Sequence, residues 1–139
     1  MQITANALQT VAINQNVFFT DTTTRGSCSI VHADGSGLTT LRGVTNQCRA
    51  RFQATFGANV ALPTGATVGP ITLAISVNGE AIGPTTMIVT PAAVEEFQHV
   101  STTYLIDVPA GCCYTISVQN IGATEIEVQN ASLIVERVA

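Results

Sequence analysis

Apolar and polar side chains alternate without interruption in the segment that begins at Cys48 and runs toward Val60. The apolar set is Cys48, Ala50, Phe52, Ala54 and Phe56, and the polar set is Arg49, Arg51, Gln53 and Thr55. Successive side chains of a β-strand point to opposite faces, so this period predicts a long strand with one buried and one polar face. We therefore expect Phe52 and Phe56 to lie in the core of a sheet protein.

Turn signals divide the rest of the chain into further short strands. Asn78-Gly79, flanked by apolar residues, strongly favours a two-residue hairpin, and Asp34–Gly37 favours a second tight turn. Ile116 and Val118 share the parity of a strand that begins at Tyr114, which places them in the core. Turn signals recur every eight to twelve residues, which is typical of a sandwich or barrel. The chain is thus expected to be all-β, with eight to ten antiparallel strands.

Two segments give less regular patterns. From Thr10 to Thr20 the apolar positions Val11, Ile13, Val17 and Phe19 share one parity, which predicts a first strand with one buried face. Residues 91–98 are the one segment in which a helix of one or two turns is expected.

The composition indicates a folded chain that is poor in charge. Hydrophobic residues make up 46% of the 139 residues and charged residues only 10%, compared with about 25% charged residues in an average soluble protein. Such a chain is not disordered, and its length suits a single domain over 1–139. With so few charges, the outer surface must be uncharged and polar or must be covered by neighbouring chains. Oligomerisation is therefore expected.

The charges that are present exclude several classes of partner. The five cationic side chains are all arginines, and the net charge is −4, so no basic stripe is available for nucleic acid. No apolar run reaches the roughly eighteen residues that span a bilayer. The start at Met1 lacks the cationic and apolar blocks of a secretory signal, so we expect assembly in the cytoplasm, with no membrane partner.

No residue pattern predicts catalysis or a cofactor. His32 and His99 are the only histidines and lie on distant segments, whereas a metal site inside a jelly-roll enzyme needs several converging histidines. No G-x-S-x-G elbow or comparable nucleophile context is found. We expect no catalytic, metal or cofactor-binding residues, and we predict that the protein is not an enzyme.

The four cysteines leave two alternatives open. Cys112 and Cys113 are adjacent, so on a strand they point to opposite faces and do not form a zinc-binding pair. Cys48 shares the inward parity of Phe52, which favours buried, free thiols. The other alternative is a disulfide between Cys48 and one member of the vicinal pair, with Cys113 as the candidate.

Arg49 and Arg51 lie on one face of the same predicted strand. They are either a solvated face or inter-subunit contacts. In the second case they pair with Glu95, Glu96 or Asp107 of a neighbouring subunit, since a guanidinium suits bidentate contacts with carboxylates.

Four segments in the second half carry a resemblance to a known family. They are Ile71–Glu80, Asp107–Gly111, Tyr114–Asn120 and the final Ala131–Ala139, which ends in Glu136-Arg137-Val138-Ala139. Together they resemble the C1q/TNF-like jelly roll, in the bacterial branch found in spore-surface glycoproteins of bacilli and in phage and prophage structural proteins of Firmicutes. The resemblance covers residues 47–139, and residues 1–46 match it only as plausible strands and a hairpin. It implies a jelly-roll β-sandwich and a homotrimer packed about a threefold axis.

The resemblance, together with the low charge, suggests a structural role on a virus particle. We expect a trimeric capsid decoration or head-fibre or tip module on the virion surface of a bacteriophage, bound to a capsid or other virion protein. One alternative is a head that binds a host receptor or a glycan through the loops Asp21–Gly26, Asp34–Gly37 and Pro91–Gln98. Another is a spore or cell-surface module.

Overall fold

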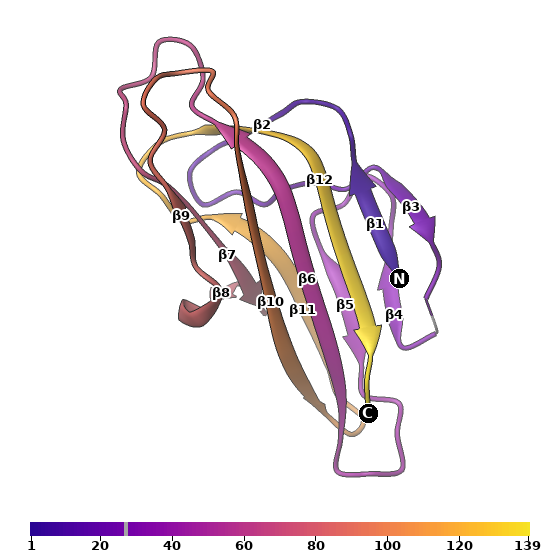
Figure 1. The fold of residues 1–139 in the computed structure, drawn as a ribbon. Helices are drawn as coiled ribbons and strands as arrows, with labels where there is room; N and C mark the ends of the chain where they lie inside the picture. The colour runs from indigo at the N-terminus through magenta and orange to yellow at the C-terminus, as the bar shows by residue number, and fades with distance from the viewer. Residues whose placement is uncertain (27) are drawn as a thin grey trace.

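The computed structural model describes residues 1–26 and 28–139, and it is a sandwich of two antiparallel sheets (Figure 1). Sheet A has the order β10-β6-β12-β1-β3, with β2 also paired to β12, and sheet B has the order β4-β5-β11-β7-β8, with β9 also paired to β7. Sheet A contains β1 (Gln2–Ala5), β2 (Gln9–Val11), β3 (Asp21–Thr24), β6 (Arg49–Ala61), β10 (Gln98–Pro109) and β12 (Ile126–Arg137). Sheet B contains β4 (Ile30–His32), β5 (Thr39–Arg42), β7 (Ile71–Val77), β8 (Glu80–Ala81), β9 (Met87–Val89) and β11 (Cys113–Asn120).

This architecture confirms the prediction of an all-β jelly-roll sandwich with antiparallel strands. The strands number twelve in the described part of the chain, rather than eight to ten. The difference arises because bends divide the polypeptide into several strands of only two to four residues. Within the same residues, no helix is long and apolar enough to cross a bilayer.

Strand β6 organises sheet A. It pairs along its length with β10, from Arg49 opposite Pro109 to Val60 opposite Gln98, and along its other side with β12. Its even-numbered residues from Ala50 to Val60 have no exposed surface. The alternation of apolar and polar residues in the sequence therefore corresponds to alternating burial along β6, and the apolar face of β6 packs against sheet B.

The core fills the space between the two sheets. Phe52 and Phe56 from β6 are fully buried, and Ile116 and Val118 from β11 meet them from the opposite sheet with at most 1% of their surface exposed. Phe56 also contacts the ring of Phe19 edge to face, with the ring centroids 6.3 Å apart. Such aromatic pairs add stabilisation beyond the area that they bury.

The expected first strand from 10 to 20 is only partly correct. Pairing to β12 ends at Val11, and Asn14 adopts a positive φ of 63° that turns the chain. The chain then crosses to sheet B, where the backbone N–H of Val17 donates to the carbonyl of Val118 at 2.8 Å. Ile13 is consequently exposed, whereas Val17 and Phe19 are buried.

The turn predictions are confirmed and the helix prediction is wrong. Asn78 and Gly79 have positive φ values of 53° and 85° and join β7 to β8, as a type I′ hairpin requires. Asp34–Gly37 joins β4 to β5, with Gly35 at a φ of 88°. Residues 91–97 form bends and a turn instead of a helix, and Glu95 in that segment has a positive φ of 59°.

Candidate functional site

The outward face of sheet A is broad and carries little charge over its middle. Ser101, Gly57 and Ser132 are opposite one another on β10, β6 and β12, and two residues along, Thr103 and Ile134 flank Thr55. The hydroxyl oxygens of Thr55 and Thr103 lie 3.2 Å apart. A face built from such small, neutral side chains presents no charge that must be desolvated when another surface covers it.

Two apolar side chains stand exposed on this face. Leu105 on β10 has 52% of its surface accessible, and Ile134 on β12 has 36%. Moreover, β10 is the terminal strand of sheet A, so one edge of its twelve residues has no partner in either described sheet. Long unpaired edges with apolar side chains are normally covered, often by another chain.

The two arginines of β6 meet Asp107 at one end of this face. The Nε of Arg51 donates to Asp107 Oδ1 at 2.8 Å, its Nη2 donates to Oδ2 at 3.3 Å, and the Nε of Arg49 lies 3.3 Å from Oδ2. The hydrogen bond from Arg51 and the positive charges of both arginines hold the pKa of Asp107 below its usual value, against an opposing contribution from desolvation. The same hydrogen bond raises the pKa of Arg51.

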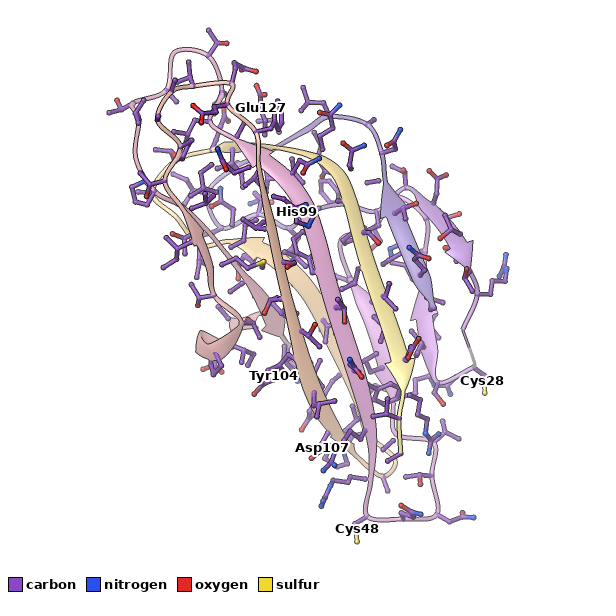
Figure 2. All side chains as sticks on the ribbon, viewed as in Figure 1. Cys28, Cys48, His99, Tyr104, Asp107 and Glu127 are labelled. Atoms are coloured by element: carbon purple, nitrogen blue, oxygen red, sulfur yellow. The ribbon has the colours of Figure 1, made fainter. Side chains whose placement is uncertain are left out.

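Within the chain, Asp107 already pairs with both arginines, and a contact with a neighbouring subunit stays a prediction. Asp107 belongs to the same chain and sits directly opposite Arg51 in the β6–β10 register. Glu95 and Glu96 are not near these arginines. Glu95 accepts hydrogen bonds from Thr64, and Glu96 accepts one from Gln98, at the other end of the sandwich. Figure 2 shows Asp107 and Glu127 at these two opposite ends.

The loop between β5 and β6 (residues 43–48) is clamped to the turn between β10 and β11. The backbone N–H of Gly43 donates to the carbonyl of Cys112 at 2.8 Å, and that of Gly111 donates to the carbonyl of Gly43 at 3.0 Å. A Cβ on Gly43 would lie 2.2 Å from the carbonyl oxygen of Pro109. Only glycine fits this close backbone approach.

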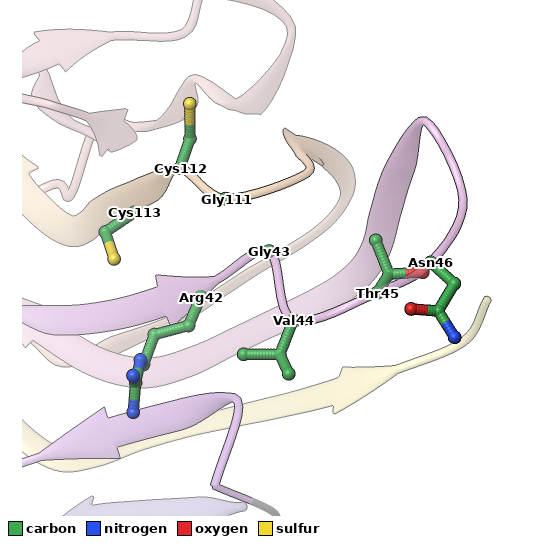
Figure 3. A pocket seen from close by; sticks show the side chains of 8 residues that line it. All are labelled: Arg42, Gly43, Val44, Thr45, Asn46, Gly111, Cys112 and Cys113. Atoms are coloured by element: carbon green, nitrogen blue, oxygen red, sulfur yellow. The ribbon is translucent and has the colours of Figure 1, made fainter.

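A hollow lies on each side of the 43–48 loop. The larger, of about 500 Å³, is lined by Arg42, Gly43, Val44, Thr45, Asn46, Gly111, Cys112 and Cys113 (Figure 3). The smaller, of about 290 Å³, is lined by Gln47, Cys48, Arg49, Arg51 and Ala139. Arg137 braces the loop, because its Nη1 donates to the carbonyl of Val44 at 2.6 Å. We call the surface formed by Arg42, Arg49, Arg51, Arg137 and the 43–48 loop the arginine end.

The opposite end of the sandwich is acidic. Glu95 Oε1 accepts hydrogen bonds from the backbone N–H and the hydroxyl of Thr64, both at 3.0 Å, which ties residues 91–97 to the segment after β6. Glu127 is the second residue of β12. Its Oε2 is buried and has no hydrogen-bond partner among the described residues. Desolvation first, and then the nearby carboxyl groups of Glu95 and Glu125, raise the pKa of Glu127.

Glu127→Gln is therefore expected to stabilise the protein at neutral pH. The native carboxyl has a raised pKa, so its favourable contribution is complete below the unfolded value of about 4.3 and is lost as the pH rises through the native pKa. At pH 7 the wild-type chain holds an unfavourable carboxylate, which Gln removes. Thermal unfolding followed by circular dichroism at pH 7 and at acidic pH should show an advantage that shrinks on acidification. Exposed Glu80→Gln is the control, and an equal gain there would contradict the assignment.

The prediction of free thiols is confirmed, and the prediction that they are buried is wrong. Cys28, Cys48, Cys112 and Cys113 are all free and exposed. Strand β6 begins at Arg49, so Cys48 lies just outside the sheet and its parity no longer directs it inward. Cys112 is in the turn and Cys113 is the first residue of β11, and their side chains point apart in Figure 3. Cys48 and Cys113 therefore form no bond with each other in the chain.

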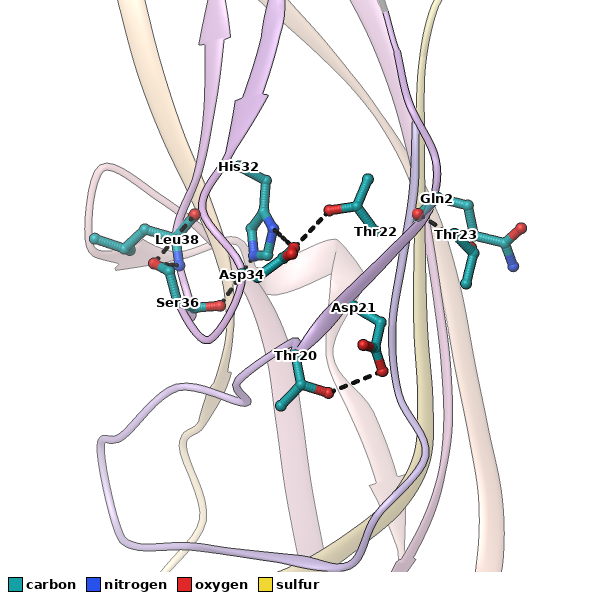
Figure 4. Close-up of polar contacts among 9 residues, drawn as sticks. All are labelled: Gln2, Thr20, Asp21, Thr22, Thr23, His32, Asp34, Ser36 and Leu38. Atoms are coloured by element: carbon teal, nitrogen blue, oxygen red, sulfur yellow. Dashed lines mark hydrogen bonds and ion pairs between the residues drawn. The ribbon is translucent and has the colours of Figure 1, made fainter.

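The two histidines take part in structural contacts. His32 Nε2 lies 3.0 Å from the carbonyl oxygen of Ser36 (Figure 4). The His32 ring also packs edge to face on Phe19. His99 Nδ1 lies 3.2 Å from Asn59 Oδ1. Over the described residues, no three His, Cys, Asp or Glu side chains are grouped so that they could hold a metal ion.

The three candidate recognition segments are not all together. The hydroxyl of Thr22 donates to Asp34 Oδ1 at 2.7 Å, which joins the segment 21–26 to the β4–β5 turn (Figure 4). The segment 91–98 lies beside the residues that follow β6 instead, where the N–H of Glu95 donates to the carbonyl of Leu62.

Sequence reasoning did not single out Arg42, Arg137, Gly43 or Glu127. The two arginines end strands β5 and β12, which come together only in the sandwich. Gly43 follows a predicted strand and carries no turn signal of its own. The alternation of Glu127 with buried Ile126 and Val128 is the one signal that could have placed it on the outward face.

No family model matches the chain, and no curated protein matches its sequence. Among solved structures, the chain is similar to the globular domain of zebrafish complement 1qA protein, with a TM-score of 0.63 and 11% identity, covering 96% of this chain and 93% of that one. The sugar-binding EclA C-terminal domain, at 13% identity over 95% of this chain and 79% of that one, has a TM-score of 0.43. Pika GITRL is 15% identical, covers 81% of this chain and 87% of its own, and has a TM-score of 0.42. The TM-scores of EclA and GITRL are too low to support a conclusion. The similarity to the complement 1qA domain shows the fold alone: the chain has a C1q-like jelly-roll fold.

Proposed function

We propose that this protein is a non-enzymatic jelly-roll module that forms homotrimers on the surface of a bacteriophage particle, as a capsid decoration or head-fibre tip. The observation that carries the proposal is the outward face of sheet A, with its neutral middle, exposed Leu105 and Ile134, and unpaired β10 edge. These properties suit a surface that other copies of the chain cover.

The low charge of the chain supports self-association. A stable obligate interface buries about 2,000 Å² or more, and sheet A offers three long adjacent strands, β10, β6 and β12, of twelve or thirteen residues each. Covering the neutral middle of these strands removes Leu105, Ile134 and an open strand edge from water, and leaves the end with Arg49 and Arg51 free. A closed ring of subunits achieves this without leaving a free copy of the same face.

The location on a phage particle rests on the resemblance of the second half to phage and prophage structural proteins. The resembling segment Ile71–Glu80 contains β7 and the turn into β8 in sheet B, and Ala131–Ala139 contains the second half of β12 in sheet A. A module of this kind acts by covering and joining surfaces, so stability against dissociation is the property on which its role depends. Purified protein is expected to bind in a fixed ratio to capsids that lack it.

The oligomeric state of the purified protein tests whether the outward face of sheet A is an interface between subunits. Sedimentation velocity of the wild-type chain is expected to show a trimer, and Leu105→Glu with Ile134→Glu is expected to shift it to a monomer, because two buried carboxylates at each contact cannot be desolvated. The matched control is Val31→Glu with Ile88→Glu, since these exposed apolar residues belong to sheet B. A monomeric wild type, or a trimer that survives the sheet A substitutions, would contradict the proposal.

A receptor- or glycan-binding head is the second candidate. The observation in its favour is the contact between Thr22 and Asp34, which joins two of the three candidate recognition segments into one surface. A glycan array with binding that Asp34→Ala abolishes would favour this candidate. An array without binding, together with binding in a fixed ratio to capsids, would favour decoration.

A further inference from the structure

The charges of this molecule are separated along its long axis. Arg49 opens β6, and Arg42 and Arg137 close β5 and β12, so these three strand ends meet around the β10–β11 turn. At the other end of β6, about 40 Å away for a strand of this length, the side chains are acidic. They are Glu95, Glu96, Glu125 and Glu127.

The guanidinium groups of the arginine end are held in place but not neutralised. Arg49 and Arg51 share the single carboxylate of Asp107. The Nη1 of Arg137 donates to the backbone carbonyl of Val44 and to the hydroxyl of Ser29, and its Nε donates to the backbone oxygen of Ala139 at 3.2 Å, so no side-chain carboxylate pairs with it among the described residues. Arg42 lines the larger hollow, opposite Cys113 in the β5–β11 register. Positive charge therefore exceeds negative charge among these side chains.

The surroundings of these arginines resemble the centre of a protein interface. Val44, near the start of the 43–48 loop, and Val138, beside Arg137, are both about half exposed. Apolar side chains with arginines around them are enriched where proteins bind one another. The hollows of about 500 Å³ and 290 Å³ on the two sides of the loop leave room for side chains of a partner.

We propose that the arginine end binds an extended, acidic segment of a partner protein. Carboxylates of the segment pair with Arg42 in the larger hollow and with Arg49 and Arg51 in the smaller one, and apolar side chains pack on Val44. Planar guanidinium groups suit bidentate carboxylates. The glutamates gather at the far end, so only the arginine end offers a surface that attracts an acidic segment. The inference extends the proposed function, since it names the end through which the module attaches to a particle.

A labelled oligoglutamate peptide is the probe, and fluorescence anisotropy at low ionic strength is the measurement. Binding is expected and should weaken as salt is added. Arg42→Gln and Arg49→Gln should each weaken it by about tenfold, the effect of losing a charge-assisted hydrogen bond. Asp107→Asn should increase the affinity for the peptide, because the carboxylate of Asp107 no longer competes with the peptide for Arg49 and Arg51. Arg25→Gln, which alters the arginine in a separate hollow beside Met1 and Cys28, should leave binding unchanged.

The cysteines supply a second readout without any substitution. Cys48 and Cys112 line the two hollows, whereas Cys28 lies in the hollow beside Arg25. Bound peptide should slow alkylation of Cys48 and Cys112, measured by mass spectrometry, and should leave the rate at Cys28 unchanged. Equal protection of all three would contradict a site at the arginine end.

Other outcomes overturn the inference directly. Absence of peptide binding at low salt would do so, and so would tighter binding of a single-stranded oligonucleotide of equal charge, which would indicate a phosphate partner. The arginine substitutions should leave the sedimentation of the trimer unchanged. If the wild type proves monomeric and still binds the peptide with the expected pattern, the trimer proposal fails and this inference stands.

Discussion

Phe56→Ala should lower the free energy of unfolding by about 3–5 kcal/mol, the range seen when a buried aromatic ring is truncated. Phe56 has no exposed surface, and its ring meets that of Phe19 edge to face at 83°. Removing the ring leaves a cavity between the two sheets that their hydrogen-bonded strands cannot close. Urea unfolding followed by circular dichroism, at one fixed protein concentration, measures the change.

Phe18→Ala is the matched control for this substitution. Phe18 is adjacent to Phe19 in sequence but has 49% of its surface exposed, so truncating it leaves no cavity. Its effect should be small, within about 0.5 kcal/mol, as for most surface substitutions. If both variants lose equal stability, the placement of Phe56 between the sheets is incorrect.

Gly43→Ala is expected to have the second largest effect, a loss of about 2 kcal/mol or more, because strain at a close contact is among the few causes of large destabilisation. The added Cβ would lie 2.2 Å from the carbonyl oxygen of Pro109, so the 43–48 loop and the β10–β11 turn must separate. The backbone hydrogen bonds between Gly43 and Cys112 and between Gly111 and Gly43 would then lengthen. Thermal unfolding measures the loss.

Gly69→Ala provides the comparison, since a Cβ there meets nothing within 4 Å and its φ is not positive. The same chemical change is expected to be neutral or to stabilise by up to about 1 kcal/mol, through the lower entropy of the unfolded chain. Gly43→Ala should also weaken oligoglutamate binding, because the displaced loop separates the two hollows. Unchanged stability of Gly43→Ala would show that the loop is not clamped to the turn.

Local periodicity explains why much of sheet A could be predicted. In β6 every second side chain is buried, and this relation holds within one strand whatever its neighbours are. The Asn78-Gly79 hairpin was equally predictable, since positive φ at two successive residues is a local requirement. The same argument failed for 10–20, where alternation arose from a chain that leaves one sheet and joins the other.

The candidate site shows the limits of such arguments more clearly. Parity predicted that Arg49 and Arg51 share a face, and the nature of guanidinium groups favoured a carboxylate partner. The sequence offered Glu95, Glu96 and Asp107 equally, and only the register of β6 with β10 selects Asp107, in the same chain. Cys48 was misplaced because parity does not say at which residue a strand begins.

From the sequence alone follow the strand content, the inward set that contains Phe52 and Phe56, the tight turns and the scarcity of charge, because each depends on a residue and its near neighbours. Only the tertiary structure brings the ends of β5, β6 and β12 together at the arginine end and gathers glutamates at the other. Strand ends that are close in space lie up to ninety-five residues apart along the chain, as do Arg42 and Arg137. Their meeting depends on sheet order and register, which many long-range pairings decide jointly and no local pattern encodes.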